Sequence, residues 1–414
     1  MFRRFSRSAG SQSLQLAGAS AASQLILALM FLITAREMTP SAFGAVVTGI
    51  SIATVAAGFI DFGSNALWVR EVTSGRMQLA DLARSRGGKI LLAAGAGALW
   101  LTATFGGLLP EYLWIAAPIA ACTVISQASQ VVLRVQVRSD LVGVATVIDR
   151  VLALVAFAGL GMFGIVGYGP ALWISMCSGM IAGSFASYFL SAREYQLAFR
   201  ISRPSNPYRD AGYYGVASIA SSAQSLDMII INSLSGSAAA GSFGAVNRWT
   251  QPLGLLVSSF AQASMPFVAR SGSWSKAWSH VRGAIWMPIM AIVGCIAIVF
   301  AAPTAVTLLL GTEYSGSVSV LQLLALAVIP AIISQPTLIF LQALGYDRPA
   351  STVMWTVVVF QLCGVLAAAP RFGAAGAAFA ILCGQLLMMT GLLLIARGAG
   401  RAGRTSQIVE GGRE

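Results

Sequence analysis

Apolar stretches of about 20 residues follow one another along the 414-residue chain, separated by short polar connections. A helix needs about 20 predominantly apolar residues to cross the hydrocarbon core of a bilayer. The stretches lack the strict apolar and polar alternation of strands in a membrane barrel. Lipid offers no hydrogen-bond partners to backbone N–H and C=O groups. The stretches must therefore cross the bilayer as helices, which satisfy their own backbone hydrogen bonds. The sequence therefore predicts an all-α, polytopic membrane helix bundle.

Composition agrees with lipid as the solvent. Charged residues make up 10% of the chain and hydrophobic residues 57%, whereas a soluble domain carries roughly 25% charged residues. The net charge of +12 is dispersed in short clusters without aromatic interleaving or a groove-entering motif, so we expect no nucleic-acid partner. The five cysteines all lie in apolar stretches and form no CxxC pair. They are best interpreted as packing residues, and we expect no metal site and no cofactor.

Twelve apolar stretches are long enough to be transmembrane helices. Their expected bounds are 14–35, 43–66, 88–108, 112–134, 142–163, 167–190, 211–234, 241–265, 283–303, 317–341, 350–369 and 374–396. Connections on one side of the membrane and the termini hold 22 Lys and Arg residues, whereas the other side holds only Arg36 and Arg371. Because basic residues concentrate on the cytoplasmic side, both termini are expected in the cytoplasm.

Short sequence matches recur about 200 residues apart and in the same order. FGAV occurs at 43–46 and 243–246, and FGxxG occurs at 163–167 and 372–376. The recurrence predicts two six-helix lobes, as in transporters built from parallel repeats. The expected division is 1–210 for the N-terminal lobe with a basic linker at its end, 211–396 for the C-terminal lobe and 397–414 for a basic cytoplasmic tail.

Polar side chains form stripes along several of the expected spans. Stripes that turn inward would give the bundle a wet interior, although small polar residues also serve as packing contacts between membrane helices. Ionisable residues inside spans are costly and mark either a cavity or an ion pair. Asp149 and Arg150 are sequence neighbours and can compensate one another. Asp227 and Arg248 each lie about seven residues from the outer end of their span, roughly 10 Å deep, and we expect them to form a pair.

Signatures of catalysis are absent from the sequence. It contains no GxxxxGK[ST] phosphate loop and no HExxH motif, so neither ATP hydrolysis by that route nor zinc proteolysis is expected. The single histidine, His280, lies in an expected cytoplasmic connection, where no Ser–His–Asp arrangement can be assembled around it. We therefore expect a transporter and not an enzyme.

Several motifs resemble one family along nearly the whole chain. The run AREMTPSAFG at 35–44, DFG at 61–63 and VRE at 69–71 resemble the opening of bacterial O-antigen and exopolysaccharide flippases. These flippases belong to the multidrug/oligosaccharidyl-lipid/polysaccharide exporter superfamily. The second half is similar to the family as well. Its matching stretches are FGAVNRW at 243–249, MPF at 265–267, LLLGTEYSGSVSVLQLLAL at 308–326 and FGAAGAAFA at 372–380.

The resemblance implies a bundle with two lobes around a central cavity that opens alternately to each side of the bacterial inner membrane. It implies a lipid-linked oligosaccharide, carried on undecaprenyl pyrophosphate, as the cargo, with membrane lipids and a polysaccharide polymerase as partners. The candidate substrate-binding residues are Arg36, Asn65, Arg150, Ser222, Asn247, Arg248 and Gln251. The candidate ion-coupling residues are Asp61, Asp149 and Asp227.

Two other classes of function remain open on these residues. A cation-coupled multidrug or metabolite antiporter of the same superfamily would use intramembrane carboxylates, but the first expected span holds none before Glu37. A membrane enzyme or an assembly scaffold would turn the polar stripes toward neighbouring proteins instead of a cavity.

Overall fold

The fold of the described residues is entirely helical. The computed structural model describes residues 9–136, 138–200, 203–208, 215, 218–219, 222–250, 253–254, 286–343 and 346–411. The long helices are α1 (Ala9–Arg36), α2 (Pro40–Asp61), α4 (Leu79–Phe105), α5 (Ala116–Val135), α6 (Ser139–Phe157), α7 (Tyr168–Leu190), α12 (Trp286–Leu309), α13 (Ser317–Ala343) and α14 (Asp347–Gly411). The shorter elements are α3 (Ser64–Thr73), α9 (Leu226–Ser235), the 3-10 turns η1 (Glu111–Ile115), η3 (Tyr195–Phe199) and η5 (Thr312–Tyr314), the π-turn η2 (Ala158–Met162) and a helix over 237–250.

Helix α14 consists of two arms that fold back on one another. The break lies at Gly373, whose φ of 57° and ψ of −141° are readily adopted only without a Cβ. A Cβ on Gly364 would lie 3.1 Å from Cβ of Ala380, and one on Gly391 would lie 2.8 Å from Cγ1 of Val353. These contacts pair the arms antiparallel, so they correspond to the expected spans 350–369 and 374–396.

The chain is a multi-pass membrane protein. Among the described residues, nine helical stretches are long and apolar enough to cross a membrane, and the 51-residue stretch Arg348–Gly398 holds both arms of α14. With α9 and the helix over 237–250, every one of the twelve expected spans has a helical counterpart. The predicted all-α membrane bundle is therefore confirmed.

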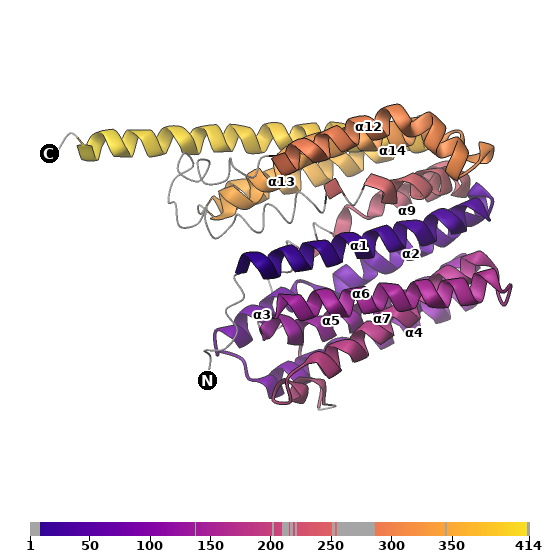
Figure 1. The fold of residues 1–414 in the computed structure, drawn as a ribbon, viewed down its shortest axis with the longest axis horizontal. Helices are drawn as coiled ribbons and strands as arrows, with labels where there is room; N and C mark the ends of the chain where they lie inside the picture. Colours follow the sequence, from indigo (N-terminus) through magenta and orange to yellow (C-terminus); the bar gives the residue numbers. More distant parts are fainter. Residues whose placement is uncertain are drawn as a thin grey trace.

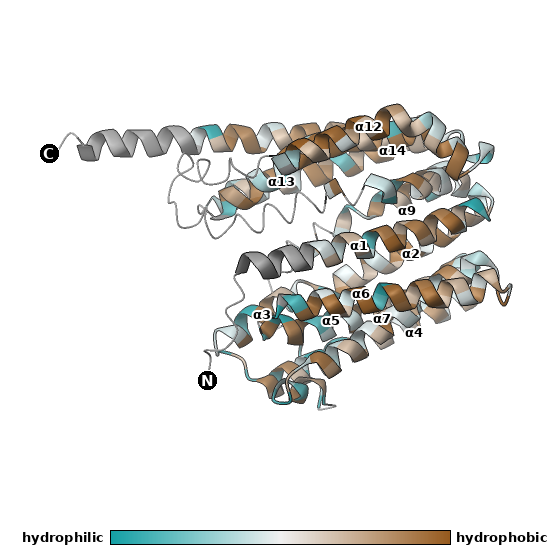
Figure 2. Ribbon diagram, viewed as in Figure 1, coloured by the Kyte–Doolittle hydropathy of each residue, from teal (hydrophilic) through white to brown (hydrophobic). Residues whose placement is uncertain are grey.

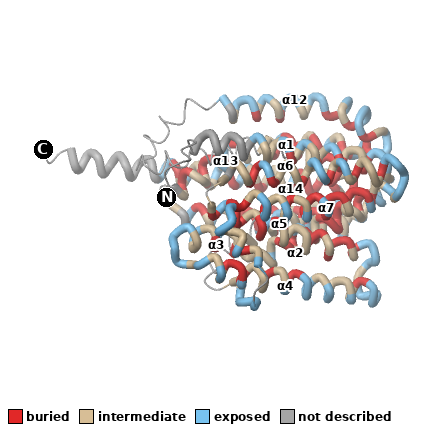
Figure 3. The backbone as a smooth tube through the Cα atoms, turned by 60° about the horizontal axis from the view of Figure 1, so that its bottom comes forward, coloured by how far each residue is buried: buried red, intermediate tan, exposed pale blue. Residues whose placement is uncertain are grey.

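The helices form two groups whose axes run in roughly the same direction (Figure 1). Helices α1 to α7 gather in one group, and α9 with α12, α13 and α14 gather in the other. Helices α4 and α12 lie at opposite edges of the bundle and carry many exposed positions (Figure 3). Large apolar side chains such as Leu99 and Phe300, 73% and 81% exposed, project from these two helices. The ribbon of α12 is largely brown in Figure 2, and exposed apolar side chains of this kind are those that a bilayer would cover.

The helices that carry the two FGAV repeats pack against each other where the groups meet. A Cβ on Gly44 would lie 2.7 Å from the amide nitrogen of Gly241 and closer still to the carbonyl oxygen of Ser237. A Cβ on Gly244 would lie 2.8 Å from Cγ1 of Val47. Glycine in both repeats thus lets α2 and the helix over 237–250 approach until their backbones touch.

Two hydrogen bonds join the groups near this crossing. The side-chain amide of Asn232 donates to the Tyr112 hydroxyl at 2.9 Å, and the Tyr314 hydroxyl donates to the Met38 carbonyl at 3.2 Å. We name these contacts and the Gly44–Gly241 crossing the outer seal, because they lie at the ends of the helices that the charge distribution predicts to face the periplasm.

The opposite end of α2 holds a sharp break. Phe62 and Gly63 both have left-handed backbone conformations, with φ of 44° and 65°, and α3 begins directly after them. The Tyr208 ring packs edge-on against Phe62 at 5.7 Å, and its hydroxyl donates to the Ile60 carbonyl at 2.6 Å. Burial, and then the negative charge of Asp61, raise the pKa of Tyr208, so the phenol keeps the proton that it donates. The break is thereby tied to the segment that links the two groups.

Helix α4 begins at Leu79, nine residues before the expected start of its span at 88. Lys89, the second residue of the expected span, lies well inside this helix, and its side chain is completely buried. The earlier start was not predicted because Arg84, Arg86 and Lys89 lower the hydropathy of the first turns.

Candidate functional site

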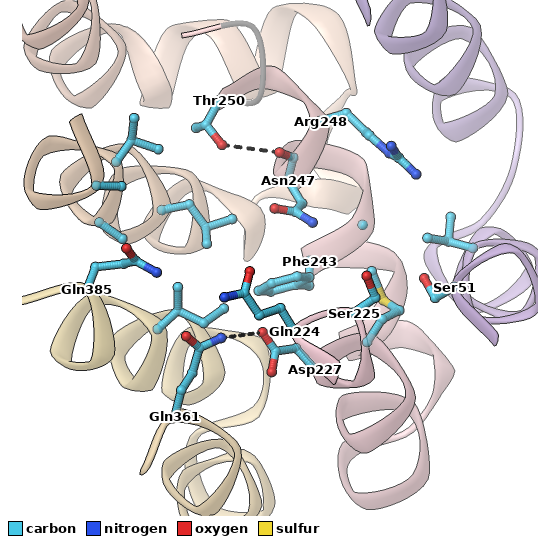
Figure 4. Close-up of a pocket in the computed structure, with 18 of the residues that line it drawn as sticks. Ser51, Gln224, Ser225, Asp227, Phe243, Asn247, Arg248, Thr250, Gln361 and Gln385 are labelled. Atoms are coloured by element: carbon cyan, nitrogen blue, oxygen red, sulfur yellow. Dashed lines mark hydrogen bonds between the residues drawn. The ribbon is translucent and has the colours of Figure 1, made fainter. Parts of the chain in front are cut away.

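A cavity of about 480 Å³ lies between α2 and the helices of the second group. Helix α2 lines it with Ser51 and Thr54, and Figure 4 shows the polar side chains that face it from the other helices. These are Gln224, Ser225, Asp227, Asn247, Arg248, Thr250, Gln361 and Gln385. Apolar residues of α2, α9, α13 and α14 complete the lining. The predicted polar interior is therefore present, and it faces a cavity.

Asp227 lies in one wall of this cavity and is held by an amide from α14. The carboxylate oxygen Oδ2 accepts a hydrogen bond from Nε2 of Gln361 at 2.8 Å, and the residue is only 6% exposed. Its other oxygen, Oδ1, is buried without a hydrogen-bond partner in the described part of the chain. Gln224 lies beside this pair in Figure 4. The arrangement leaves one carboxylate oxygen able to accept a proton or a cation.

The expected ion pair between Asp227 and Arg248 is not formed, so this prediction was wrong. The Arg248 guanidinium lies over the Phe31 ring of α1, 4.8 Å from its centroid, and it points away from Asp227 (Figure 4). A cation over an aromatic face is stabilised by the ring quadrupole. Asp227 and Arg248 instead contact Gln361 and Phe31, which belong to helices far away in the sequence. The prediction compared only the depths of Asp227 and Arg248 along their own helices, and that comparison could not identify these partners.

A second arginine, on α6, lies near Arg248. Arg150 of α6 is close enough to act electrostatically on Arg248, and its Nη1 lies 3.5 Å from Oδ1 of Asp149. Asp149 is buried where α6 meets α7, and its Cβ would lie 2.9 Å from a Cβ on Gly183. Asp149 and Arg150 thus compensate one another locally, while the neighbouring Arg248 adds a second positive charge.

The remaining acidic candidate belongs to a separate cluster. Asp61 pairs with Nζ of Lys89 at 2.7 Å, and the same ammonium donates to Asn65 at 2.8 Å and lies over the Trp68 ring at 4.1 Å. Neither Asp61 nor Asn65 lines the cavity. The premise that Asp61 is an isolated carboxylate was wrong, because Lys89 neutralises it.

The other described substrate-binding candidates lie outside the cavity lining. Arg36 is exposed at the end of α1. Ser222 instead packs against Gly58 of α2, the contact expected of a small polar packing residue. Gln251 lies outside the described residues. The structure thus brings Asp227, Asn247 and Arg248 together around one cavity and leaves the other described candidates apart from it.

Sequence reasoning missed Gln361 and Gln385, one on each arm of α14. Each is an amide within a long apolar run, and that contrast is a signal that could have identified both. No group of three His, Cys, Asp or Glu residues that could hold a metal ion occurs among the described residues.

Comparison with known proteins adds a family and a fold. A family model described as polysaccharide biosynthesis protein matches residues 11–272. No curated protein sequence matches the chain significantly. Several solved structures are similar in fold. A multidrug resistance MATE transporter of the MOP superfamily, in an inward-facing conformation, has a TM-score of 0.72 and 17% identity, over 92% of this chain and 96% of that chain.

Two further structures are similar over most of their length. The lipid II flippase MurJ, in an inward closed conformation, has a TM-score of 0.71 and 11% identity, over 93% of this chain and 87% of that chain. A MOP superfamily transporter from Pyrococcus furiosus has a TM-score of 0.57 and 16% identity, over 95% and 96%. The chain therefore has the fold of MOP superfamily transporters.

Proposed function

Since the chain belongs to the polysaccharide biosynthesis protein family, we propose that it is a flippase for lipid-linked oligosaccharide. It moves an undecaprenyl-pyrophosphate-linked glycan from the cytoplasmic to the periplasmic leaflet of the bacterial inner membrane by alternating access. Membrane lipids surround it, both termini are cytoplasmic, and a polysaccharide polymerase uses the delivered glycan.

The observation that carries this proposal is Arg248 on the wall of a polar cavity inside a membrane bundle. The cargo combines a pyrophosphate, a hydroxyl-rich glycan and an apolar tail. A guanidinium offers forked donors to phosphate oxygens. The Phe31 ring lies against the guanidinium and positions it at the cavity wall.

The amides of the cavity suit the glycan. Gln224, Asn247 and Gln385 each offer donors and acceptors to sugar hydroxyls. The apolar lining from α13 and α14 provides surface against which the faces of a sugar ring can pack. The lipid tail stays in the bilayer and needs no enclosed site.

Alternating access requires the outer seal to open. In this structure the two groups touch through Gly44 and Gly241 at the expected periplasmic end. The division at the linker 191–210 gives two lobes that can move apart at this contact. We assign the coupling role to Asp227, whose buried Oδ1 accepts a proton or Na⁺. Asp61 and Asp149 already have basic partners.

The cation-coupled antiporter remains the second candidate, and Asp227 is the observation that favours it. A carboxylate in a polar cavity could bind a cationic drug directly instead of a coupling ion. Arg248 on the same cavity argues for an anionic cargo, because it would repel an organic cation.

The test compares Arg248→Ala with Arg248→Lys in cells that depend on this chain for glycan export. Arg248→Ala should make lipid-linked oligosaccharide accumulate in the cytoplasmic leaflet, and Arg248→Lys should restore export only partly, because an ammonium lacks the fork. Arg348→Ala, at the exposed start of α14, is the matched control. Normal export by Arg248→Ala, at normal protein levels, would overturn the proposal.

A further inference from the structure

A second polar hollow lies where α7 ends, away from the central cavity. It has a volume of about 300 Å³ and is lined by Tyr188, Arg193, Gln196, Leu197, Phe199 and Arg200. None of these residues lines the central cavity. The hollow is formed by the last turn of α7 and by η3, which folds back beneath it.

Two arginines give the hollow its charge. Arg193 and Arg200 are both exposed, and neither forms an ion pair with another residue of the described chain. Four other basic residues near this end, Arg76, Arg84, Lys89 and Arg138, have carboxylate partners. The hollow therefore presents two guanidinium groups that pair with no carboxylate of the described residues.

The walls behind these arginines are fixed by ring contacts. The Phe199 ring packs edge-on against Tyr188 at 5.3 Å, and the Arg86 guanidinium covers Phe199 at 4.6 Å. Arg86 also donates to the Ser129 hydroxyl at 3.2 Å, which ties η3 to α4 and α5. A preformed wall lowers the ordering cost of binding a ligand in front of it.

Apolar side chains continue from the hollow along the outside of α7. Phe185 and Phe189, one helical turn apart, are 62% and 74% exposed, and Leu197 beside the arginines is 44% exposed. These side chains face lipid in a membrane bundle, and aromatic residues such as Tyr188 mark the level of the headgroups. The arginines thus lie at the boundary between hydrocarbon and water.

We propose that this hollow binds the phosphate of an anionic phospholipid of the cytoplasmic leaflet. Arg193 and Arg200 clasp the phosphate oxygens, and the acyl chains lie along Phe185 and Phe189. Basic pockets between membrane helices on the cytoplasmic side have the chemistry to hold such headgroups. The bound lipid holds η3, and with it the start of the linker 191–210, at the membrane surface. The pyrophosphate of the cargo has related chemistry, and the experiment distinguishes the two sources.

The experiment measures lipid binding to the purified full chain by native mass spectrometry. The probes are phosphatidylglycerol, which is anionic, phosphatidylcholine, which is zwitterionic, and undecaprenyl pyrophosphate. The variants are Arg193→Gln with Arg200→Gln, and Arg348→Gln as the matched control on an exposed arginine outside the hollow. We expect wild type and control to retain one tightly bound phosphatidylglycerol. The double variant should bind it about thirtyfold more weakly, given the value of each surface arginine toward anionic lipid.

Each other outcome overturns the proposal. Equal retention of phosphatidylglycerol by the double variant would show that the arginines do not hold a headgroup. Equal binding of phosphatidylcholine would remove the selectivity for anionic lipid. If undecaprenyl pyrophosphate displaced phosphatidylglycerol from wild type at equimolar concentration, the hollow would belong to the cargo. A thermal unfolding scan of the double variant verifies that it is folded.

Discussion

Gly44 and Gly241, from the two halves of the sequence, lie so close that a Cβ on Gly44 would stand 2.7 Å from the amide nitrogen of Gly241. The same Cβ would come closer still to the Ser237 carbonyl oxygen. Backbone contact of this kind holds the two helix groups together at one end of the bundle. The Asn232–Tyr112 hydrogen bond joins the two groups at the same end.

The first prediction concerns this crossing. Gly44→Ala should destabilise the protein by about 1–3 kcal/mol, because the added methyl group meets backbone that cannot rotate away. Gly95→Ala on α4 is the matched control, since no atom lies within 4 Å of its added Cβ. Thermal unfolding in detergent measures both variants. Equal unfolding temperatures for Gly44→Ala and wild type would contradict the close contact.

The second prediction tests whether the outer seal must open. Tyr112→Cys together with Asn232→Cys replaces a hydrogen-bonded pair of side chains by two thiols that a short bis-methanethiosulfonate reagent can join through disulfide bonds. Cross-linking should stop export, and a reducing agent should restore it. The Tyr112→Cys single variant, treated in the same way, controls for modification without a bridge. Export that continues after complete cross-linking would show that this end does not open during transport.

The third prediction concerns the buried ion pair between Lys89 and Asp61. Lys89→Met should lower the free energy of unfolding by about 3 kcal/mol, because it leaves the Asp61 carboxylate without its cation. Adding Asp61→Asn should recover part of the loss, since the double variant has no orphaned charge. Arg84→Met, in an exposed pair with Asp81, should change stability by less than about 1 kcal/mol. A double variant less stable than Lys89→Met alone would refute this account.

The fourth prediction tests Asp227 as the coupling residue. Asp227→Asn preserves an oxygen that can accept from Gln361, so the variant should fold normally. It should lose the dependence of export on the proton or Na⁺ gradient, because a neutral amide cannot take up a proton. Asp81→Asn, at an exposed carboxylate, is the control. A full response of the Asp227→Asn variant to both gradients would exclude Asp227 from coupling.

The fifth prediction concerns orientation. Ser315→Cys should react from the periplasm with a thiol reagent that does not cross membranes, and Ser74→Cys should react from the cytoplasm, because both residues are exposed. Ser317, which also follows an expected periplasmic connection, is fully buried and donates to the Ser242 carbonyl at 2.9 Å. Ser317→Cys is therefore the unreactive control. Labelling from the opposite sides would reverse the predicted topology.

The sequence by itself determined the membrane class and the helices. Twenty-residue apolar runs have few physical solutions in lipid, so the helices of α1, α7 and α13 could be predicted close to their observed bounds. It also predicted that Asp149 and Arg150 would compensate one another, because residues adjacent in the chain are close in space.

Only the tertiary structure decided which distant side chains meet. Gln361 reaches Asp227 across 134 residues of sequence, Lys89 turns inward to Asp61, and Phe31 lies beneath Arg248. Helical periodicity assigns a residue to a face of its own helix, but it does not say which helix that face will pack against. The polar partners in this protein follow from that packing, and so does the choice of Arg248 and Asp227 as the charged groups of the cavity.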